Sequence, residues 1–175
     1  MREIYIFDID GCVMPPIFSN FNSNESRKNI VKEVIKNGNN VNLFPAFIKF
    51  YEKYCIQAEL VFFITGRKKS EFGTLTEDQL QALAKIKPFQ TIYYPEGNSH
   101  KIKKYFTWKA KKIKEIIKNT INRKNFSKNS QENVKFTIFD DLNDYFPKIR
   151  KFNDKYRVQI HLTLIENENC WNHLI

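Results

Sequence analysis

Short apolar segments recur along this chain, and stretches with helical spacing lie between them. This alternation is typical of a parallel sheet built from βαβ units. The first expected strand is apolar at nearly every position, which predicts burial on both faces. The last has apolar residues at every second position, which predicts an exposed edge. The five expected strands are Arg2–Ile9, Leu60–Ile64, Thr91–Tyr94, Val134–Phe139 and Arg157–Ile165.

Helices are expected between these strands. Thr76-Glu77-Asp78-Gln79 has the pattern of a capping box, which predicts that a helix opens there and runs to about Ile86. Residues 119–133 are polar and cationic, which predicts a loop. The other expected helices are Glu25–Lys36, Pro45–Cys55, part of Lys101–Asn119, and one that begins after Asp141.

A length of 175 residues, without an internal repeat or a long linker, predicts one domain over residues 1–175. Residues 12–43 are less regular, and we expect a small flap or helical insertion there. No stretch approaches the roughly 18–20 apolar residues that cross a bilayer, and the first residues do not resemble a signal peptide. Three widely spaced cysteines argue against a disulfide framework or a zinc site. We therefore expect a cytoplasmic protein with no membrane partner; the oligomeric state stays open.

The positive charge of the chain is concentrated in one segment. Residues 98–130 hold 11 lysine and arginine residues against one acidic residue, Glu115, and so account for the net charge of +10. Such a patch attracts polyanions. A run of lysines also forms an ordinary solvated helix face, so nucleic acid is one of two interpretations of this segment.

Polar residues follow three of the expected strands directly. Ligands bind at the carboxyl ends of the strands in open α/β sheets, so these residues are expected to converge on one site. After the first strand, Asp8 and Asp10 would point to the same side if the strand continued through them. Such a pair can hold Mg²⁺, and one carboxylate could attack phosphorus while the other moves a proton. A solvated strand end with a turn at Gly11 is the structural alternative.

The second and third groups carry a hydroxyl and further acids. Thr65 and Gly66 follow the second strand, where a hydroxyl and free N–H groups can cradle a phosphoryl oxygen; a simple turn is the alternative. Asp140, Asp141 and Asp144 follow the fourth strand, and such close acids repel one another unless a cation neutralises them. A helix N-cap with an acidic first turn explains the same residues structurally.

Lys109 lies within the apolar stripe of its expected helix. At 100° per residue, the helical period places it among isoleucine and aromatic residues, whereas most neighbouring lysines face away. A lysine that faces inward is costly unless a carboxylate or phosphate pairs with it. Lys112 lies at the margin of the stripe, where its long side chain can reach water. We therefore expect Lys109, rather than Lys112, to reach the acidic residues.

Taken together and in this order, the motifs DxDG, ITGR, an inward lysine and FDDLND resemble those of the haloacid dehalogenase superfamily of phosphohydrolases. The match spans Ile4 to Asp144. The resemblance implies a Rossmann-like three-layer α/β sandwich, with a mainly parallel sheet of about five strands and helices on both faces. The sequence departs from the family pattern at Cys12, where threonine is common, and at Phe139, where glycine is common.

The resemblance also implies a role for each site residue. Asp8 would be the nucleophile that forms an aspartyl-phosphate, and Asp10 would protonate the leaving group and then activate water. Thr65 and Gly66 would bind the phosphoryl group, and Lys109 would neutralise its charge. Magnesium would be held by carboxylates drawn from Asp8, Asp10, Asp140, Asp141 and Asp144, with the choice between Asp141 and Asp144 left open.

We therefore expect a Mg²⁺-dependent phosphomonoesterase with no large cap domain and a phosphorylated substrate. An open site of this kind suits bulky substrates, and the basic segment 98–130 could steer a nucleic-acid end toward the acidic residues. The alternative is a catalytically silent nucleic-acid-binding or scaffold protein that keeps the fold.

Overall fold

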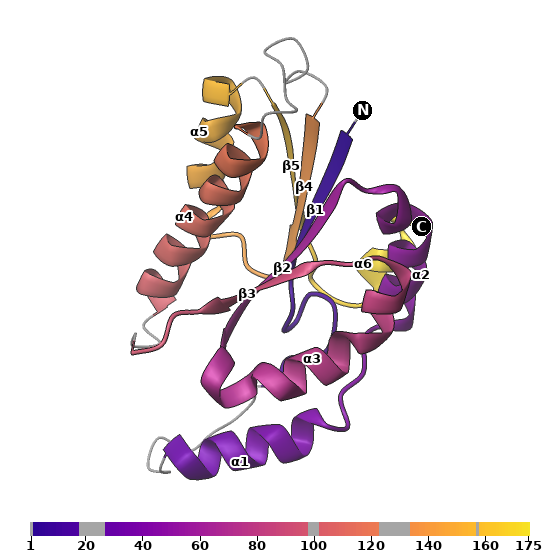
Figure 1. Cartoon of the computed structure of the whole chain (residues 1–175), viewed down its shortest axis with the longest axis vertical. Coiled ribbons are helices and arrows are strands. Elements are labelled where there is room, and N and C mark those ends of the chain that lie inside the picture. The colour runs from indigo at the N-terminus through magenta and orange to yellow at the C-terminus, as the bar shows by residue number, and fades with distance from the viewer. Residues whose placement is uncertain (1, 18–26, 98–101, 123–133, 157) are drawn as a thin grey trace.

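The computed structural model describes residues 2–17, 27–97, 102–122, 134–156 and 158–175. Within them the chain forms an α/β sandwich around one sheet of five parallel strands, in the order β3-β2-β1-β4-β5. Helices cover both faces of this sheet (Figure 1). The Rossmann-like three-layer architecture expected from the sequence is confirmed. The strands are β1 Arg2–Asp8, β2 Leu60–Lys68, β3 Gln90–Tyr94, β4 Val134–Asp140 and β5 Gln159–Leu164.

The central strand β1 is buried on both faces, as its continuous apolar sequence predicts. Its side chains alternate between the two layers that flank the sheet. Ile4 and Ile6 belong to one apolar cluster, and Tyr5 and Phe7 belong to the other. The outer strand β5 lies at an edge of the sheet beside β4, so its alternating pattern was interpreted correctly.

An aromatic core fills the layer behind one face of the sheet. It is covered by helix α2 (Pro45–Tyr54), the 3-10 turn η1 (Cys55–Gln57), part of α3 (Lys69–Ile86) and the short C-terminal helix α6 (Asn169–Asn172). The ring of Phe7 stacks on Phe139 with centroids 5.1 Å apart and meets Phe47 edge-on at 5.2 Å. Trp171 of α6 is fully buried in the same cluster. Phe139 thus has a packing role at the position where the resembled family commonly has glycine.

Two helices cover the opposite face and run side by side (Figure 1). They are α4 (Ile102–Ile121) and α5 (Phe146–Tyr156). The inward stripe predicted for α4 is present, since Ile113, Ile116 and Ile117 are buried against the sheet. The lysines of α4 lie on its other faces, with Lys109 as the exception.

Helix α1 (Arg27–Gly38) packs against α3 in a small separate cluster. Val34 of α1 and Ile17 contact Phe72 and Leu75 of α3 in this cluster. It is the helix expected at Glu25–Lys36, although the first two residues of that range lie outside the described part of the chain. The described residues of the 12–43 insertion hold this one helix and contain no large cap.

Two predicted boundaries were wrong. Helix α3 begins at Lys69, not at a Thr76 cap; the Thr76 hydroxyl instead donates to the carbonyl of Phe72, one turn earlier in the same helix. Strand β2 continues through Thr65 and Gly66 to Lys68, with a shift of its register against β3 after Thr65. The expected loop at residues 119–133 lies mostly outside the described residues, and α4 continues to Ile121.

No helix in the described ranges is both long enough and apolar enough to span a membrane.

Candidate active site

The register of the sheet brings two of the predicted aspartates to the same level. Phe7 of β1 pairs with Phe139 of β4, so Asp8 and Asp140 each follow one step later on adjacent parallel strands. Both carboxylates are buried, with Asp8 5% and Asp140 0% exposed. The carboxyl ends of the two strands thus place two acids together in a region that excludes water.

Lys109 of α4 connects these two acids. Its Nζ donates to Asp8 Oδ1 at 2.5 Å and also forms an ion pair with Asp140 Oδ2. The lysine is 1% exposed, so this charge is desolvated and depends on its two partners. Lys112 instead pairs with Glu115 of the same helix at 2.7 Å and remains partly exposed. The helical period thus selected the inward lysine correctly.

Asp141 completes an acidic group with Asp8 and Asp140. One carboxylate oxygen from each residue can be chosen so that all three lie within 4.8 Å of one another. Gly11 makes room for this arrangement, because a Cβ at that position would overlap the Asp141 carboxylate. Gly11 also has a φ of +82°, a conformation that favours glycine. Asp144 is exposed and lies outside this group.

The electrostatics of the group are unbalanced without a further cation. Burial raises the pKa of Asp8 well above its ordinary value, Lys109 opposes that rise, and repulsion from Asp140 and Asp141 adds to it. Burial, followed by repulsion from Asp140, raises the pKa of Asp141 to about 7. Burial alone would lower the pKa of Lys109, but Asp140 and Asp8 raise it well above its ordinary value.

Two tyrosines hold the carboxylates in place. The hydroxyl of Tyr105, on α4, donates to Asp8 Oδ1 at 3.2 Å, and that of Tyr145 donates to Asp140 Oδ2 at 2.5 Å. The backbone N–H of Leu142 donates to the other oxygen of Asp140 at 3.0 Å. Neither tyrosine was predicted from the sequence. Tyr105 was interpreted as part of the apolar stripe, and Tyr145 had no signal beyond its position next to the acidic motif.

Thr65 and Gly66 lie beside these residues but inside strand β2. Ile64 of β2 pairs with Asp8 of β1, and Thr65 is the next residue along β2. The Thr65 hydroxyl is buried and accepts a hydrogen bond from the Arg67 backbone N–H at 3.1 Å. A Cβ on Gly66 would contact the ring of Tyr105 at 3.4 Å. Both residues therefore border the site.

Asp10 is separate from the acidic group in the described structure. Its carboxylate forms a two-point ion pair with Arg67, with Nε–Oδ2 at 2.9 Å and Nη2–Oδ1 at 2.7 Å. The sequence did not single out Arg67, although it is fully buried. Arginine in the ITGR motif was the available signal, but nothing in the chain order indicated its partner 57 residues earlier.

The donor set of the acidic group fits a hard divalent cation. Three carboxylates with converging oxygens are the ligands that such ions prefer. Burial and, after it, repulsion from the neighbouring carboxylates raise the pKa values of Asp8 and Asp141, and a bound cation would favour their charged forms. Asp8, Asp140 and Asp141 are therefore the residues that could hold a metal ion.

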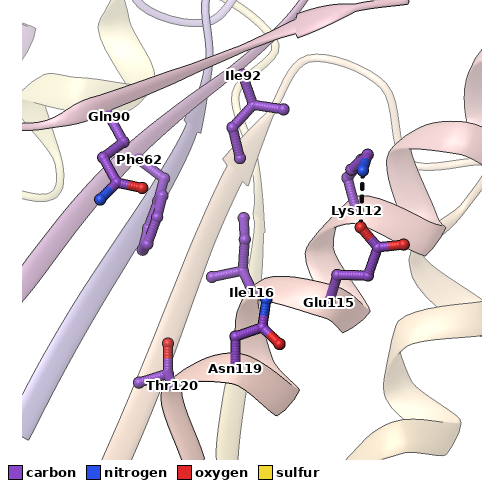
Figure 2. A pocket seen from close by; sticks show the side chains of 8 residues that line it. All are labelled: Phe62, Gln90, Ile92, Lys112, Glu115, Ile116, Asn119 and Thr120. Atoms are coloured by element: carbon purple, nitrogen blue, oxygen red, sulfur yellow. Dashed lines mark hydrogen bonds and ion pairs between the residues drawn. The ribbon is translucent and has the colours of Figure 1, made fainter. Parts of the chain in front are cut away.

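A hollow of about 260 Å³ lies elsewhere, between the β2–β3 edge of the sheet and α4. Figure 2 shows Phe62, Gln90 and Ile92 on the sheet facing Ile116, Asn119 and Thr120 of the helix. Lys112 and Glu115 pair with each other at its rim. Its lining does not include Asp8, Asp140 or Asp141, so the candidate chemistry lies outside this hollow.

The sequence was compared with protein-family models and with curated proteins, and neither comparison gave a match.

Proposed function

We propose that this protein is a magnesium-dependent phosphatase that hydrolyses a phosphomonoester through an aspartyl-phosphate on Asp8. The buried Asp8–Lys109–Asp140 group, with Asp141 beside it, carries the proposal. A phosphate dianion and a carboxylate repel each other, so an aspartate can attack phosphorus only where cations offset both charges. Lys109 supplies one such charge. The motif resemblance to haloacid dehalogenase phosphohydrolases supports the same reaction.

The reaction proposed for the chain's own residues has two steps. Before the first step, Asp10 takes up a proton from solvent at a carboxylate lone pair that Arg67 does not occupy. In the first step, an Asp8 carboxylate oxygen forms a bond to phosphorus and the ester P–O bond breaks, while Asp10 gives that proton to the departing oxygen. In the second, Asp10 takes a proton from water, whose oxygen attacks phosphorus and breaks the bond to Asp8. Lys109, the Thr65 hydroxyl and Gly66 would hold the phosphoryl oxygens.

A magnesium ion held by Asp8, Asp140 and Asp141 would neutralise the charge of the phosphoryl group. Hydrogen bonds from Tyr105 and Tyr145 hold two of these carboxylates, those of Asp8 and Asp140. The buried surroundings strengthen each of these charge interactions, because little water screens them.

A phosphate-release assay with a panel of sugar phosphates, nucleotides, phosphorylated oligonucleotides and phosphopeptides tests this proposal. We expect turnover with Mg²⁺, none with EDTA, and a loss of at least about 1,000-fold in Asp8→Asn. Asp78→Asn on the exposed side of α3 is a matched control and should keep full activity. Activity that survives in Asp8→Asn would show that the nucleophile is another residue.

We further propose that the substrate is a phosphorylated nucleic-acid end. Helices α4 and α5 lie side by side on one side of the sheet (Figure 1). Exposed and partly exposed lysine and arginine residues of these helices form what we call the basic face. The two helices contact each other. The Nζ atoms of Lys114 and Lys118 on α4 lie 5.5 and 6.0 Å from the centroid of the Phe152 ring on α5. The basic face comprises Lys103, Lys104, Lys111, Lys114, Lys118, Lys148, Arg150 and Lys151.

Part of this basic face lies on α4, the helix that also carries Lys109 into the acidic site. A polyanion lying along α4 could therefore place a terminal phosphate near Asp8. Lysine contacts to phosphates release counterions, so salt should weaken binding. For each tenfold rise in salt concentration, the logarithm of the binding constant for a single strand should fall by roughly 0.7 per phosphate contact. Parts of the basic segment 98–130 lie outside the described residues, and α5 adds cations beyond that segment.

A charge-removal pair tests the nucleic-acid substrate. Lys111→Gln with Lys148→Gln should lower kcat/KM for a phosphorylated oligonucleotide and reduce its salt dependence, while leaving a sugar phosphate unaffected. Lys49→Gln with Lys85→Gln, two exposed lysines of α2 and α3, is the matched control. Equal oligonucleotide turnover at low and high salt would contradict the proposal. Oligonucleotide binding without turnover of any ester would instead favour the silent binding protein.

A further inference from the structure

Arg67 is the largest charged side chain buried in the described structure, and it lies next to the loop that follows Asp8. It is 0% exposed. A buried guanidinium is costly unless its donors are satisfied, and planar two-point pairing with a carboxylate suits it best. The Arg67–Asp10 ion pair meets this requirement with donor–acceptor distances of 2.7 and 2.9 Å.

The remaining donors of Arg67 fix its orientation from helix α3. Nη1 donates to Thr76 Oγ1 at 3.0 Å and to Gln79 Oε1 at 2.6 Å. The Thr76 hydroxyl can accept this bond because its own proton is given to the Phe72 carbonyl. The guanidinium is therefore held on one side by α3 and on the other by Asp10, and these contacts together fix its position and orientation.

Gln79 extends this connection to the 12–43 insertion. Its amide Nε2 donates to the carbonyl of Gly38 at 2.8 Å and to that of Val41 at 3.4 Å, at the end of α1 and just after it. The insertion also contacts Asp10 directly, because the Ile17 N–H points to Asp10 Oδ1 at 3.5 Å. A chain of hydrogen bonds thus runs from the end of α1 through Gln79 and Arg67 to Asp10.

We infer that Arg67 is a positioning residue that holds the Asp10 carboxylate in a fixed orientation for proton transfer. Through Gln79, Arg67 also connects this carboxylate by hydrogen bonds to the end of α1 in the insertion. The inference rests on the proposed phosphatase function. Two-point pairing prevents rotation of the carboxylate, while Oδ2, which accepts from Arg67 Nε, keeps a second lone pair for the reacting proton. The rate of proton transfer falls sharply when the acid lies beyond hydrogen-bond distance of the reacting oxygen. A carboxylate held in one orientation therefore transfers its proton faster than a mobile one.

Leaving-group dependence separates this role from a merely structural one. An alkyl phosphate needs a proton at its departing oxygen, whereas 2,4-dinitrophenyl phosphate leaves as a stable anion without one. With Mg²⁺ present, we expect Arg67→Lys to lower kcat/KM for the alkyl ester by on the order of 100-fold. The same variant should lower kcat/KM for the dinitrophenyl ester by less than about threefold. Asp10→Asn should show the same selective loss, because kcat/KM reports only the steps up to formation of the aspartyl-phosphate and not its hydrolysis by water.

Gln79→Leu keeps the test decisive if Arg67→Lys does not fold, because Gln79 is only partly buried. It should give the same selective loss, on the order of tenfold, and Gln81→Leu on the exposed side of α3 should give none. Equal losses on both esters, or no loss on either, would overturn the positioning role while leaving the phosphatase intact. A wild-type protein that hydrolyses neither ester would overturn the proposed function, and this inference with it.

Discussion

The candidate site combines two buried carboxylates, one partly buried carboxylate and one buried ammonium group in a small volume. Each of these charges is costly alone, and the contacts of Lys109 with Asp8 and Asp140 offset part of that cost. The ordinary ion pair of Lys112 with Glu115 lies only a turn away on the same helix but is partly exposed. The two lysines thus form a natural comparison between a desolvated and a solvated charge pair.

Replacement of Lys109 should destabilise the fold far more than replacement of Lys112. Lys109→Met leaves two buried carboxylates without their partner, which costs about 3–5 kcal/mol in the free energy of unfolding. Lys112→Met should cost less than about 1 kcal/mol, because that pair is exposed to water. Denaturant unfolding of both variants at neutral pH measures the difference. Equal losses would show that the buried pair contributes no more than the surface pair.

Asp141 should make the metal-free protein less stable as the pH rises. Its pKa is raised from 3.8 to about 7 in the folded state, so the fold binds this proton more tightly than the unfolded chain does. The resulting stability is fully present below about pH 4 and is lost as the pH rises through 7. Unfolding measured against pH in EDTA should show a flatter profile for Asp141→Asn. If the pH dependence of unfolding is the same in Asp141→Asn as in the wild type, Asp141 is not the group responsible for it.

At the level of elements, the C-terminal helix α6 holds the loop that follows Asp8. The Trp171 Nε1–H donates to the Cys12 carbonyl at 2.8 Å, and its ring packs against Phe47 and Phe139 at 4.9 and 5.0 Å. A four-residue helix has too few residues for a periodic signal, so no pattern in the sequence could predict it. The chain terminus thereby supports the loop that contains Gly11.

Trp171→Ala should destabilise the protein by about 3–5 kcal/mol, because it opens a cavity in the aromatic core. Trp171→Phe keeps most of the packing but leaves the buried Cys12 carbonyl without its donor, which costs about 1–3 kcal/mol. His173→Ala, an exposed residue of the same turn, is the control and should change stability by less than about 0.5 kcal/mol. A similar loss in His173→Ala would assign the effect to α6 as a whole.

Strong periodicity allowed the sheet and the inward face of α4 to be predicted from the sequence. Lys109 could be found because a charge within an apolar stripe stands out at the helical period. Arg67 could not, because its partners Asp10, Thr76 and Gln79 come together only in the folded chain. The capping-box prediction failed for the same reason: Thr76 and Gln79 have the residue types of a cap but bond to Arg67 within the helix.

At the scale of the whole molecule, adjacent strands and a covering helix assemble the acidic site from distant parts of the sequence. Asp8 and Asp140 meet because β4 pairs with β1, and Lys109 reaches them because α4 covers that face of the sheet. A cation bound there would link both strands. Binding to the folded state alone stabilises it in proportion to occupancy.

Magnesium should therefore raise the stability of the wild-type protein. At a concentration of about 100 times its Kd the expected gain is about 2.7 kcal/mol, measured as a shift of the thermal midpoint against an EDTA control. Asp140→Asn should lose most of this gain, and Asp78→Asn should keep it. A shift that persists in Asp140→Asn would place the cation elsewhere on the molecule.

The most direct measurement is acid quenching during turnover of a substrate labelled in its phosphoryl group, followed by peptide mapping. We expect an alkali-labile phosphoryl group on the peptide that contains Asp8, dependent on Mg²⁺ and absent from Asp8→Asn. Label on a different residue, or turnover with no labelled protein at any time point, would contradict the central claim.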